Sequence, residues 1–309
     1  MPVSVLSTTV GLSILIPVYN FDVTPLVHAL ATQLKITGRT GEIILLDDGS
    51  DINLVNNNQS LLNTPFVTFY KNQKNEGRMA ARQKLAGYAR YDHLLFLDCD
   101  SVIIKDDFLS AYFELIDEKV VLASGGRVYT QEPPEECDFM LHWTYGTKRE
   151  SRKPGNADKK GPGFMSNNFL VKRELFDQLD SSLQLTGYGH EDSWWGIQFE
   201  QAGVQCQYIN NPVRHGALEK SETFLVKSEK ALANLLILEK NVGKHSLSQH
   251  VKIFRWYSRL KGSGLSGIYL FFEKPFIRSF RKNLLGCKPN LFYFDCYRLG
   301  ILMRLAKNH

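Results

Sequence analysis

The chain has 309 residues, of which 43% are hydrophobic and 22% charged. It can therefore bury the core of one large domain with an appendage, and this composition excludes a disordered chain. No apolar run reaches the roughly 18 uncharged residues of a membrane-spanning helix, and no basic leader opens the chain, so we expect a cytoplasmic protein. The five cysteines are scattered and lack Cys-x-x-Cys spacing, which predicts reduced thiols and neither disulfides nor a zinc site.

The net charge of +5 is unevenly distributed along the chain. Residues 240–309 carry fourteen Lys and Arg against two acidic residues, which gives +12 and leaves −7 for residues 1–239. We therefore expect two regions with different partners, 1–240 and 241–309.

Apolar runs with the length of buried strands alternate with helical patterns in the first hundred residues. Thr24-Pro25 opens one helix, which Gly38 or Gly41 ends, and another helix follows Gly77. The strand-like runs span 12–18, 42–46, 66–70 and 93–97, and later ones span 120–123 and 204–209. This order predicts an α/β fold with a mostly parallel sheet. The sequence has no Gly-x-Gly-x-x-Gly after the first strand and no Walker loop, which disfavours dinucleotide dehydrogenases and P-loop enzymes.

Carboxylates directly follow two of these predicted strands. Asp47 and Asp48 come after the second, and Asp98 and Asp100 come after the fourth. The carboxyl ends of the strands border the ligand crevice of an open α/β sheet, and hard oxygen ligands there suit a divalent cation that also binds phosphate oxygens. We therefore interpret Asp98-Cys99-Asp100 as a metal and diphosphate site. The alternative is that these aspartates merely cap a helix or a turn.

Four motifs occur in the order and spacing of the family 2 glycosyltransferases, which are inverting enzymes of the GT-A fold: Ser13-Ile14-Leu15-Ile16-Pro17-Val18-Tyr19-Asn20, Asp47-Asp48-Gly49-Ser50, Asn75-Glu76-Gly77 with Ala81-Arg82, and Asp98-Cys99-Asp100. The chain resembles this family over residues 11–240. The resemblance implies a Rossmann-like sheet flanked by helices, a nucleotide-sugar donor and a divalent cation, Mn²⁺ or Mg²⁺. It implies that Asp98 addresses ribose and metal, that Asp100 is the direct metal ligand, and that Arg82 lies near the base or diphosphate. Further predicted donor contacts are Pro17, Tyr19, Asn20, Asp47 or Asp48, Asn75 and Gly77.

A second acidic pair, Glu191-Asp192, follows two glycines and opens a predicted helix that ends at Gly203. Such a pair can simply complement the helix dipole. The segment resembles, however, that of galactosyl- and N-acetylgalactosaminyl-transferring GT-A enzymes, which implies that Asp192 is the base for the acceptor hydroxyl, with Glu191 next in line. Trp194 would offer an aromatic face to the sugar. A glycosidase is disfavoured because adjacent carboxylates need not flank one bond.

Three other segments carry candidate site residues. Phe164–Asn168 resembles the family's Gly-Gly-Asn segment, so Asn168 is a predicted sugar contact. His215 lies a short strand beyond the acidic helix, like the metal-binding histidine of several GT-A families, and is a predicted metal ligand. The stretch 148–163 is typical of a mobile loop, and its functional interpretation is a lid that meets the diphosphate through Arg149, Arg152, Lys153, Lys159 and Lys160.

The basic C-terminal region predicts helices over 246–261 and 268–285, with aromatic side chains beside Lys and Arg. These helices either pack on the catalytic domain with solvated charges or bind an anionic membrane surface. We favour the membrane, at its inner face, because a lipid-linked acceptor would be found there. No recognition motif supports nucleic acid as a partner. The oligomeric state stays open.

Together the motifs predict a metal-dependent inverting glycosyltransferase that moves a sugar from a UDP-linked donor to a glycan or lipid-linked glycan. The alternative is a non-catalytic nucleotide-sugar-binding or scaffold protein on the same fold. Asp98, Asp100 and Asp192 are all present, and this favours the enzyme.

Overall fold

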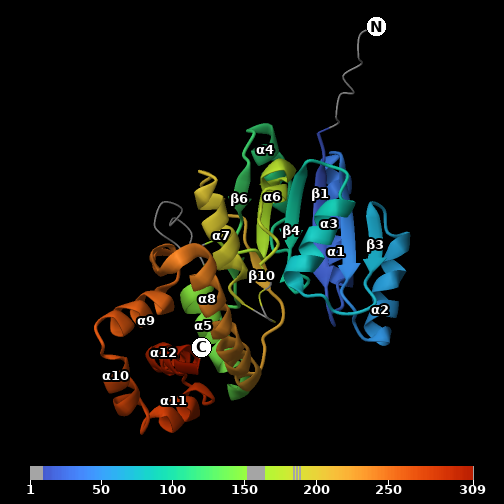
Figure 1. The fold of residues 1–309 in the computed structure, drawn as a ribbon. Coiled ribbons are helices and arrows are strands. Elements are labelled where there is room, and N and C mark those ends of the chain that lie inside the picture. The colour runs from blue at the N-terminus through green and yellow to red at the C-terminus, as the bar shows by residue number, and fades with distance from the viewer. Residues whose placement is uncertain (1–9, 152–163, 184, 186, 188, 309) are drawn as a thin grey trace. The chain divides into compact units, whose positions relative to one another are not determined.

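The computed structural model describes residues 10–151, 164–183, 185, 187 and 189–308 (Figure 1). They form two compact units, each assembled from three segments of the chain. The first unit draws on Met1–Gly126, Ser166–Leu179 and Cys206–Arg214, and the second on Arg127–Met165, Asp180–Gln205 and His215–His309.

A seven-stranded sheet forms the centre of the first unit. The strands β3, β2, β1 and β4 are neighbours in that order and run parallel, whereas β8 is antiparallel to β4 and β6, and β9 is parallel to β6. This arrangement confirms the predicted α/β fold with a mostly parallel sheet. The strands span Leu12–Val18 (β1), Gly41–Asp47 (β2), Val67–Lys71 (β3), His93–Leu97 (β4), Leu122–Ser124 (β6), Asn168–Lys172 (β8) and Gln207–Tyr208 (β9), and the short β5 spans Ser101–Val102.

The strand order reverses between β1 and β4. The chain runs outward from β1 through β2 and β3 and then places β4 on the other side of β1. The register sets Val18 beside Asp47 and Leu15 beside Phe96. The carboxyl ends of β1, β2 and β4 therefore meet at the reversal point, where open α/β sheets bind their ligands.

Helices cover the sheet, which is why nearly every residue of β1, β2 and β4 is buried. One face, including Ile14 and Ile43, packs against the apolar sides of α1 and α4. The buried Ala81 and Leu85 of α3 lie outside this cluster, and α3 contacts β1 and β2. Gly38, with φ 60°, ends α1 as predicted. The helices span Thr24–Thr37 (α1), Ile52–Gln59 (α2), Arg78–Tyr88 (α3), Phe108–Asp117 (α4) and Arg173–Asp177 (α6), with a 3-10 turn at Ser60–Asn63 (η1).

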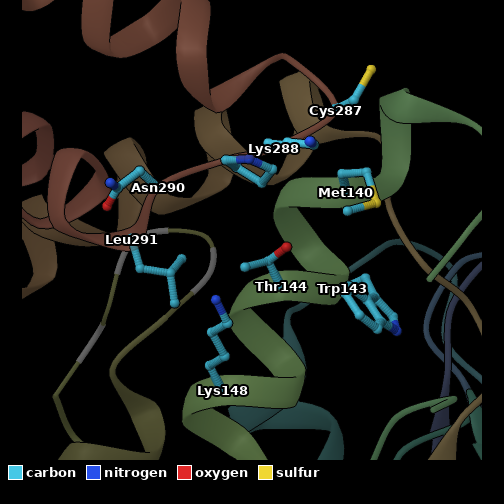
Figure 2. A pocket seen from close by; sticks show the side chains of 9 residues that line it. Met140, Trp143, Thr144, Lys148, Cys287, Lys288, Asn290 and Leu291 are labelled. Atoms are coloured by element: carbon cyan, nitrogen blue, oxygen red, sulfur yellow. The ribbon is translucent and has the colours of Figure 1, made fainter. Parts of the chain in front are cut away.

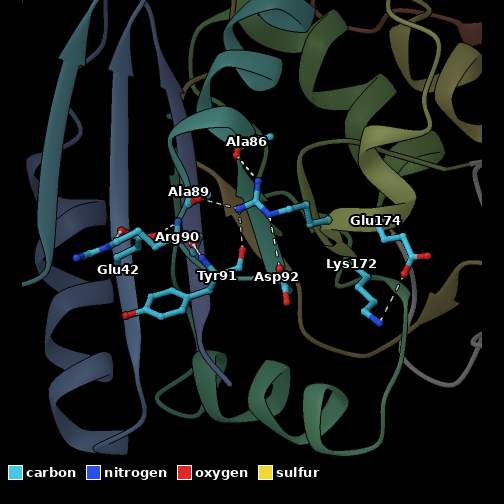
Figure 3. A network of polar contacts seen from close by, with 10 residues as sticks. Glu42, Ala86, Ala89, Arg90, Tyr91, Asp92, Lys172 and Glu174 are labelled. Carbon is cyan, nitrogen blue, oxygen red and sulfur yellow. Dashed lines mark hydrogen bonds and ion pairs between the residues drawn. The ribbon is translucent and has the colours of Figure 1, made fainter. Parts of the chain in front are cut away.

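A network of hydrogen bonds joins the chain segments at the amino-terminal ends of β1, β2 and β4, at the opposite end of the strands from Asp47 and Asp98 (Figure 3). The buried Glu42 accepts hydrogen bonds from Ser13 Oγ at 2.7 Å and from Arg90 N at 2.7 Å and Nε at 2.8 Å. Arg173 places its cation at the C-terminal end of α3, which is electrostatically favourable. Its guanidinium donates to the carbonyls of Ala86 (2.7 Å), Ala89 (2.8 Å) and Tyr91 (2.9 Å). This network stabilises the amino-terminal end of the sheet, away from the candidate site.

Helices make up most of the second unit, and α5, α8, α11 and α12 share one buried apolar cluster, formed by Leu141, Leu225, Leu284, Phe294 and Tyr297. Helix α8 breaks at Gly243, which has φ 79° and lies three residues after the predicted boundary at 240. The expectation that residues 1–240 and 241–309 bind different partners stays a prediction. The elements span Arg127–Val128 (β7), Cys137–Phe139 (η2), Met140–Tyr145 (α5), Gly146–Glu150 (η3), Glu191–Gln201 (α7), Val213–His215 (β10), Ser221–His250 (α8), Lys252–Gly262 (α9), Ser266–Glu273 (α10), Ile277–Leu284 (α11) and Leu291–Asn308 (α12).

The two long helices predicted for the C-terminal region are both wrong in detail. The stretch 246–261 is interrupted, because α8 ends at His250 and Val251 adopts φ −114° before α9 begins. The stretch 268–285 is divided into α10 and α11 by a turn that contains Pro275, a residue that cannot donate a helical hydrogen bond. In the described part of the chain, every helix is too short or too polar to cross a membrane.

The prediction that all cysteines are reduced is wrong for two of them. Cys137 and Cys287 form a disulfide, with their Cα atoms 4.4 Å apart. They are separated by 150 residues in the sequence, so local spacing carries no signal of the pairing. Cys99, Cys206 and Cys296 are thiols.

Candidate functional site

Asp47, the last residue of β2, has one carboxylate oxygen without a hydrogen-bond partner among the described residues. Its side chain is fully buried, and Oδ1 accepts hydrogen bonds from Gly49 N at 3.2 Å and Ser50 N at 3.0 Å. Oδ2 is buried too and has no hydrogen-bond partner among the described residues. An unsatisfied buried acceptor is costly. Asp47 is therefore the carboxylate of this pair that has an acceptor left for a ligand N–H, and its neighbours must move for a ligand to reach it because the side chain is 0% exposed.

Asp48 is instead occupied by the loop that follows β3. Its Oδ1 accepts hydrogen bonds from Asn72 Nδ2 at 2.7 Å and Glu76 N at 3.0 Å, and its Oδ2 accepts one from Gly77 N at 2.9 Å. These bonds fix the loop that carries the predicted Asn75, whose side chain is exposed. Asp48 thus holds the loop of residues 72–77 in place, and the backbone N–H of Gly77 donates to its carboxylate.

The loops after β1 and β2 are tied together beside Asp47. Asn20 has φ 49°; its N–H donates to Ser50 Oγ at 2.8 Å, and its Oδ1 accepts a hydrogen bond from Asp51 N at 2.8 Å. Tyr19 is 50% exposed, whereas Pro17 is half-buried within β1. Of these predicted donor contacts, Tyr19 and Asn20 are exposed, and the Oδ1 of Asn20 is already engaged by Asp51 N.

Asp98, at the end of β4, is held by a buried arginine. Arg82 is 1% exposed, and its Nη2 donates to Asp98 Oδ1 at 2.6 Å and to the carbonyl of Ser166 at 3.4 Å. Asp98 N donates to the carbonyl of Asn167 at 3.0 Å. Arg82 therefore lies behind Asp98 and fixes the position of this carboxylate. Asp100 follows in the turn and is half-buried.

Asp98 and Asp100 are hard oxygen donors, which fits a divalent cation such as Mn²⁺. The described residues contain no group of three or more His, Cys, Asp and Glu arranged to hold a metal ion. Two carboxylates are enough where phosphate oxygens and water complete the coordination shell. Asp98 Oδ1 accepts a hydrogen bond from Arg82, and Asp100 as the direct metal ligand stays the prediction that the family resemblance implies.

The amide of Asn168 is used within the first unit. Its Nδ2 donates to the carbonyls of Gly126 at 3.1 Å and Asn211 at 2.9 Å, and its Oδ1 accepts a hydrogen bond from Tyr112 Oη at 2.5 Å. The predicted sugar contact would require these bonds to break. The neighbouring Asn167 has a buried Oδ1 with no hydrogen-bond partner in the described chain, so it is the better candidate. Two adjacent asparagines in the sequence do not reveal which one is engaged.

Glu191 and Asp192 begin α7 in the second unit, as predicted. The preceding residues Gly189 and His190 have φ 104° and 70°. Glu191 is mostly buried and its Oε2 accepts a hydrogen bond from Gly189 N at 2.9 Å, while Asn234 Nδ2 donates to the Gly189 carbonyl at 2.8 Å. Glu191 thus fixes the glycine loop, and Asp192 is the more open carboxylate of the pair.

The histidine before this pair is neutral at physiological pH. Removal from water, together with the positive charge of Arg298, lowers the pKa of His190 to about 3. Its Nδ1 lies 3.3 Å from Ser193 Oγ. The imidazole therefore adds no positive charge beside Asp192.

Trp194 and His215 are both largely buried in the second unit. Trp194 is 6% exposed and donates its indole N–H to the carbonyl of Asp180 at 3.1 Å. The ring of His215 lies 5.1 Å from that of Tyr129 and 5.0 Å from that of His142, measured between centroids. Both side chains contribute to packing, and their predicted roles in sugar stacking and metal binding stay predictions.

Most of the predicted lid, including Arg152, Lys153, Lys159 and Lys160, lies outside the described residues. Arg149 lies within them, and its guanidinium donates to both carboxylate oxygens of Asp295 at 2.7 Å. The charge of Arg149 is therefore already paired within the second unit.

The second unit also has an open pocket of about 410 Å³ (Figure 2). Lys148 and Lys288 give this pocket a positive charge, and Cys287 of the disulfide borders it. Its lining consists of Met140, Trp143, Thr144, Lys148, Cys287, Lys288, Pro289, Asn290 and Leu291. None of these residues belongs to the predicted donor, metal or catalytic sets.

Comparison with known proteins assigns this architecture. Among solved structures, the chain is similar to the mannosyltransferase PcManGT from Pyrobaculum calidifontis in complex with GDP-Man and Mn²⁺, with a TM-score of 0.51 and 11% identity over 96% of this chain and 86% of that one. It is also similar to glucosyl-3-phosphoglycerate synthase from Mycobacterium tuberculosis in complex with Mn²⁺, UDP and phosphoglyceric acid, with a TM-score of 0.50 and 17% identity over 73% and 77% of the two chains. These likenesses show the expected GT-A fold.

The sequence comparisons give the family. No curated protein matches the chain. The family model described as "Glycosyl transferase family 2" matches residues 13–180, which is more than half of the chain and includes the carboxylates that end β2 and β4. The chain therefore belongs to glycosyl transferase family 2.

Proposed function

We propose that the protein is a metal-dependent inverting glycosyltransferase that transfers a sugar from a UDP-linked donor to a glycan or a lipid-linked glycan. Asp47 would bind the nucleobase, Asp100 the metal, and Asp192 would act as the base. Two structures of similar fold were solved with Mn²⁺ and either GDP-Man or UDP, which supports this choice of cation and donor class.

The unpartnered Oδ2 of Asp47 carries the proposal. A carboxylate can only accept a hydrogen bond, so it suits a base whose pairing edge offers an N–H. Uracil and guanine have a ring N–H in the middle of that edge, whereas cytosine and adenine have a ring acceptor there and offer N–H groups only from the exocyclic amino group. The buried oxygen at the end of β2 therefore supports a uridine or guanosine donor, and we propose uridine.

The remaining residues account for the chemistry of transfer. A bound Mn²⁺ would stabilise the negative charge that develops on the leaving diphosphate. Asp100 would hold the ion, and Asp98, fixed by Arg82, would bind ribose. Asp192 would take the proton of the acceptor hydroxyl while the hydroxyl oxygen attacks the anomeric carbon opposite the diphosphate. One C–O bond forms as the other breaks, so the configuration inverts.

The decisive experiment measures nucleoside diphosphate release from UDP-, GDP-, CDP- and ADP-sugars, with Mn²⁺ and with a chelator. UDP-galactose and UDP-N-acetylgalactosamine come first because the Glu191-Asp192 segment resembles that of enzymes using these donors. We expect UDP release that requires Mn²⁺. Asp100→Ala should abolish Mn²⁺-dependent UDP binding in calorimetry without changing the unfolding midpoint.

The matched control is Asp92→Ala, because Asp92 is an exposed carboxylate that pairs with Arg173 at 3.8 Å at the opposite end of the strands. This variant should bind UDP like the wild type. Equal release with Mn²⁺ and chelator would contradict the metal dependence. Tight UDP-sugar binding without release, across donors and acceptors, would instead establish the non-catalytic binding protein.

A further inference from the structure

Helix α10 turns its apolar side chains to the solvent. Its buried residue is the acidic Glu273, which is 5% exposed. A surface helix normally buries its apolar side and exposes its charges, so α10 has the reverse orientation. The exposed apolar side chains within residues 265–276 are Leu265 (44%), Ile268 (54%), Phe271 (75%), Phe272 (65%) and Phe276 (55%). We call this set the α10 face.

Polar contacts hold α10 in this orientation on α12. Glu273 Oε2 accepts a hydrogen bond from Arg304 Nη1 at 2.8 Å, and Tyr269 Oη donates to the carbonyl of Cys296 at 2.8 Å. Gly300 makes room for the carboxylate, because a Cβ there would lie 2.5 Å from Glu273 Oε1. The orientation is therefore specified by matched partners on both helices, and the α10 face is not needed for packing on α12.

The sequence that carries the α10 face is strongly basic, and one of its cations, Arg281, pairs with Glu222 of α8. Residues 252–290 contain nine Lys and Arg and a single acidic residue, Glu273, which is buried and paired with Arg304. Lys274, Arg278 and Lys282 are exposed next to the phenylalanines in the sequence. Figure 1 shows α9, α10 and α11 following one another in an arc around α12. An exposed apolar set bordered by cations is the pattern of an interfacial membrane contact.

We propose that the α10 face docks on an anionic membrane surface. The phenylalanines would enter the boundary between headgroups and acyl chains, and Lys274, Arg278 and Lys282 would meet lipid phosphates. A second copy of the chain is a poorer occupant, because a symmetric dimer would set two such basic faces against each other. The inference is independent of the transferase activity, since the contact is measurable without a donor.

Sedimentation of the full-length protein with vesicles tests this contact. The vesicles contain phosphatidylcholine alone or phosphatidylcholine with phosphatidylglycerol. We expect binding to the anionic vesicles that salt weakens. Phe271→Ser with Phe272→Ser should weaken binding by about tenfold per phenylalanine, and Lys274→Gln with Arg278→Gln by roughly 30-fold together, at about fivefold per basic residue.

The matched control is Ile36→Ser, because Ile36 is 76% exposed on α1 of the first unit. This variant should bind vesicles like the wild type. All substituted side chains are exposed, so the thermal unfolding midpoints should stay unchanged. Absence of anionic-vesicle binding at low ionic strength would overturn the proposal, as would equal binding to both kinds of vesicle. A lipid-free dimer that Phe271→Ser with Phe272→Ser dissociates would assign the face to self-association.

Discussion

Asp47→Asn tests whether the carboxylate at the end of β2 recognises the nucleobase. The amide keeps an oxygen where Oδ1 accepts hydrogen bonds from Gly49 N and Ser50 N, so the turn is preserved. The group that replaces the unpartnered Oδ2 becomes an NH₂ donor. Toward uracil N3–H an acceptor is thereby exchanged for a donor, whereas toward cytosine N3 the same exchange creates a matched pair.

The size of the effect follows from the lost hydrogen bond. A hydrogen bond to a charged group contributes about 1.5 to 3 kcal/mol. With about 1.4 kcal/mol per tenfold change in Kd, the affinity for UDP should fall by roughly 10- to 150-fold. The affinity for CDP should rise, because the new amide donates to the base.

Calorimetric titration of the wild type and Asp47→Asn with UDP, CDP and GDP, all with Mn²⁺, measures this exchange. Asp48→Asn is the matched control. Asp48 supports the loop after β3, so its substitution should weaken all three nucleotides by a similar factor. Unchanged UDP affinity in Asp47→Asn, or equal losses for UDP and CDP, would refute base recognition and leave Asp47 as a turn residue.

Three further changes probe other parts of the chain. Asp192→Asn should keep UDP affinity and lower single-turnover transfer by about 10²- to 10⁴-fold, as for a positioned general base; near-normal transfer would remove Asp192 from that role. Arg82→Met should lower the free energy of unfolding by about 3 to 5 kcal/mol, because the buried Asp98 carboxylate loses its cation; an unchanged urea midpoint would contradict this. Replacing Cys137 and Cys287 with Ser should cost up to about 5 kcal/mol by loop entropy, given their separation of 150 residues; equal urea midpoints with and without reductant would be evidence against the bond.

The central strands could be predicted because they are buried on both faces and so form uninterrupted apolar runs. The runs 12–18 and 93–97 coincide with β1 and β4, and the predicted ranges for β2 and β3 differ from the structure by one residue at each end. The carboxylates at the ends of β2 and β4 could be found in the same way. Residues that directly follow a predicted parallel strand lie at the carboxyl-terminal end of the sheet, where the ligand crevice is expected.

Which polar side chain is available to a ligand could not be predicted. Asp47 and Asp48 are adjacent and chemically identical, and they differ only in the hydrogen-bond partners that tertiary structure brings to each. The same holds for Asn167 and Asn168. The sequence pattern also suggested that Phe271 and Phe272 belong to an amphipathic helix, but their exposure depends on the pairing of Glu273 with Arg304.

The Cys137–Cys287 bond makes a large part of the chain a covalent ring. A protease that cuts one peptide bond inside this ring leaves a single connected molecule, and the two fragments separate only after reduction. Deleting the chain from residue 246 onward would instead leave Cys137 without its partner and strip Phe294 and Tyr297 from the cluster around Leu141. Helices α11 and α12 are thus packed into the interior of the second unit, and removal of the C-terminal region would break both this packing and the disulfide.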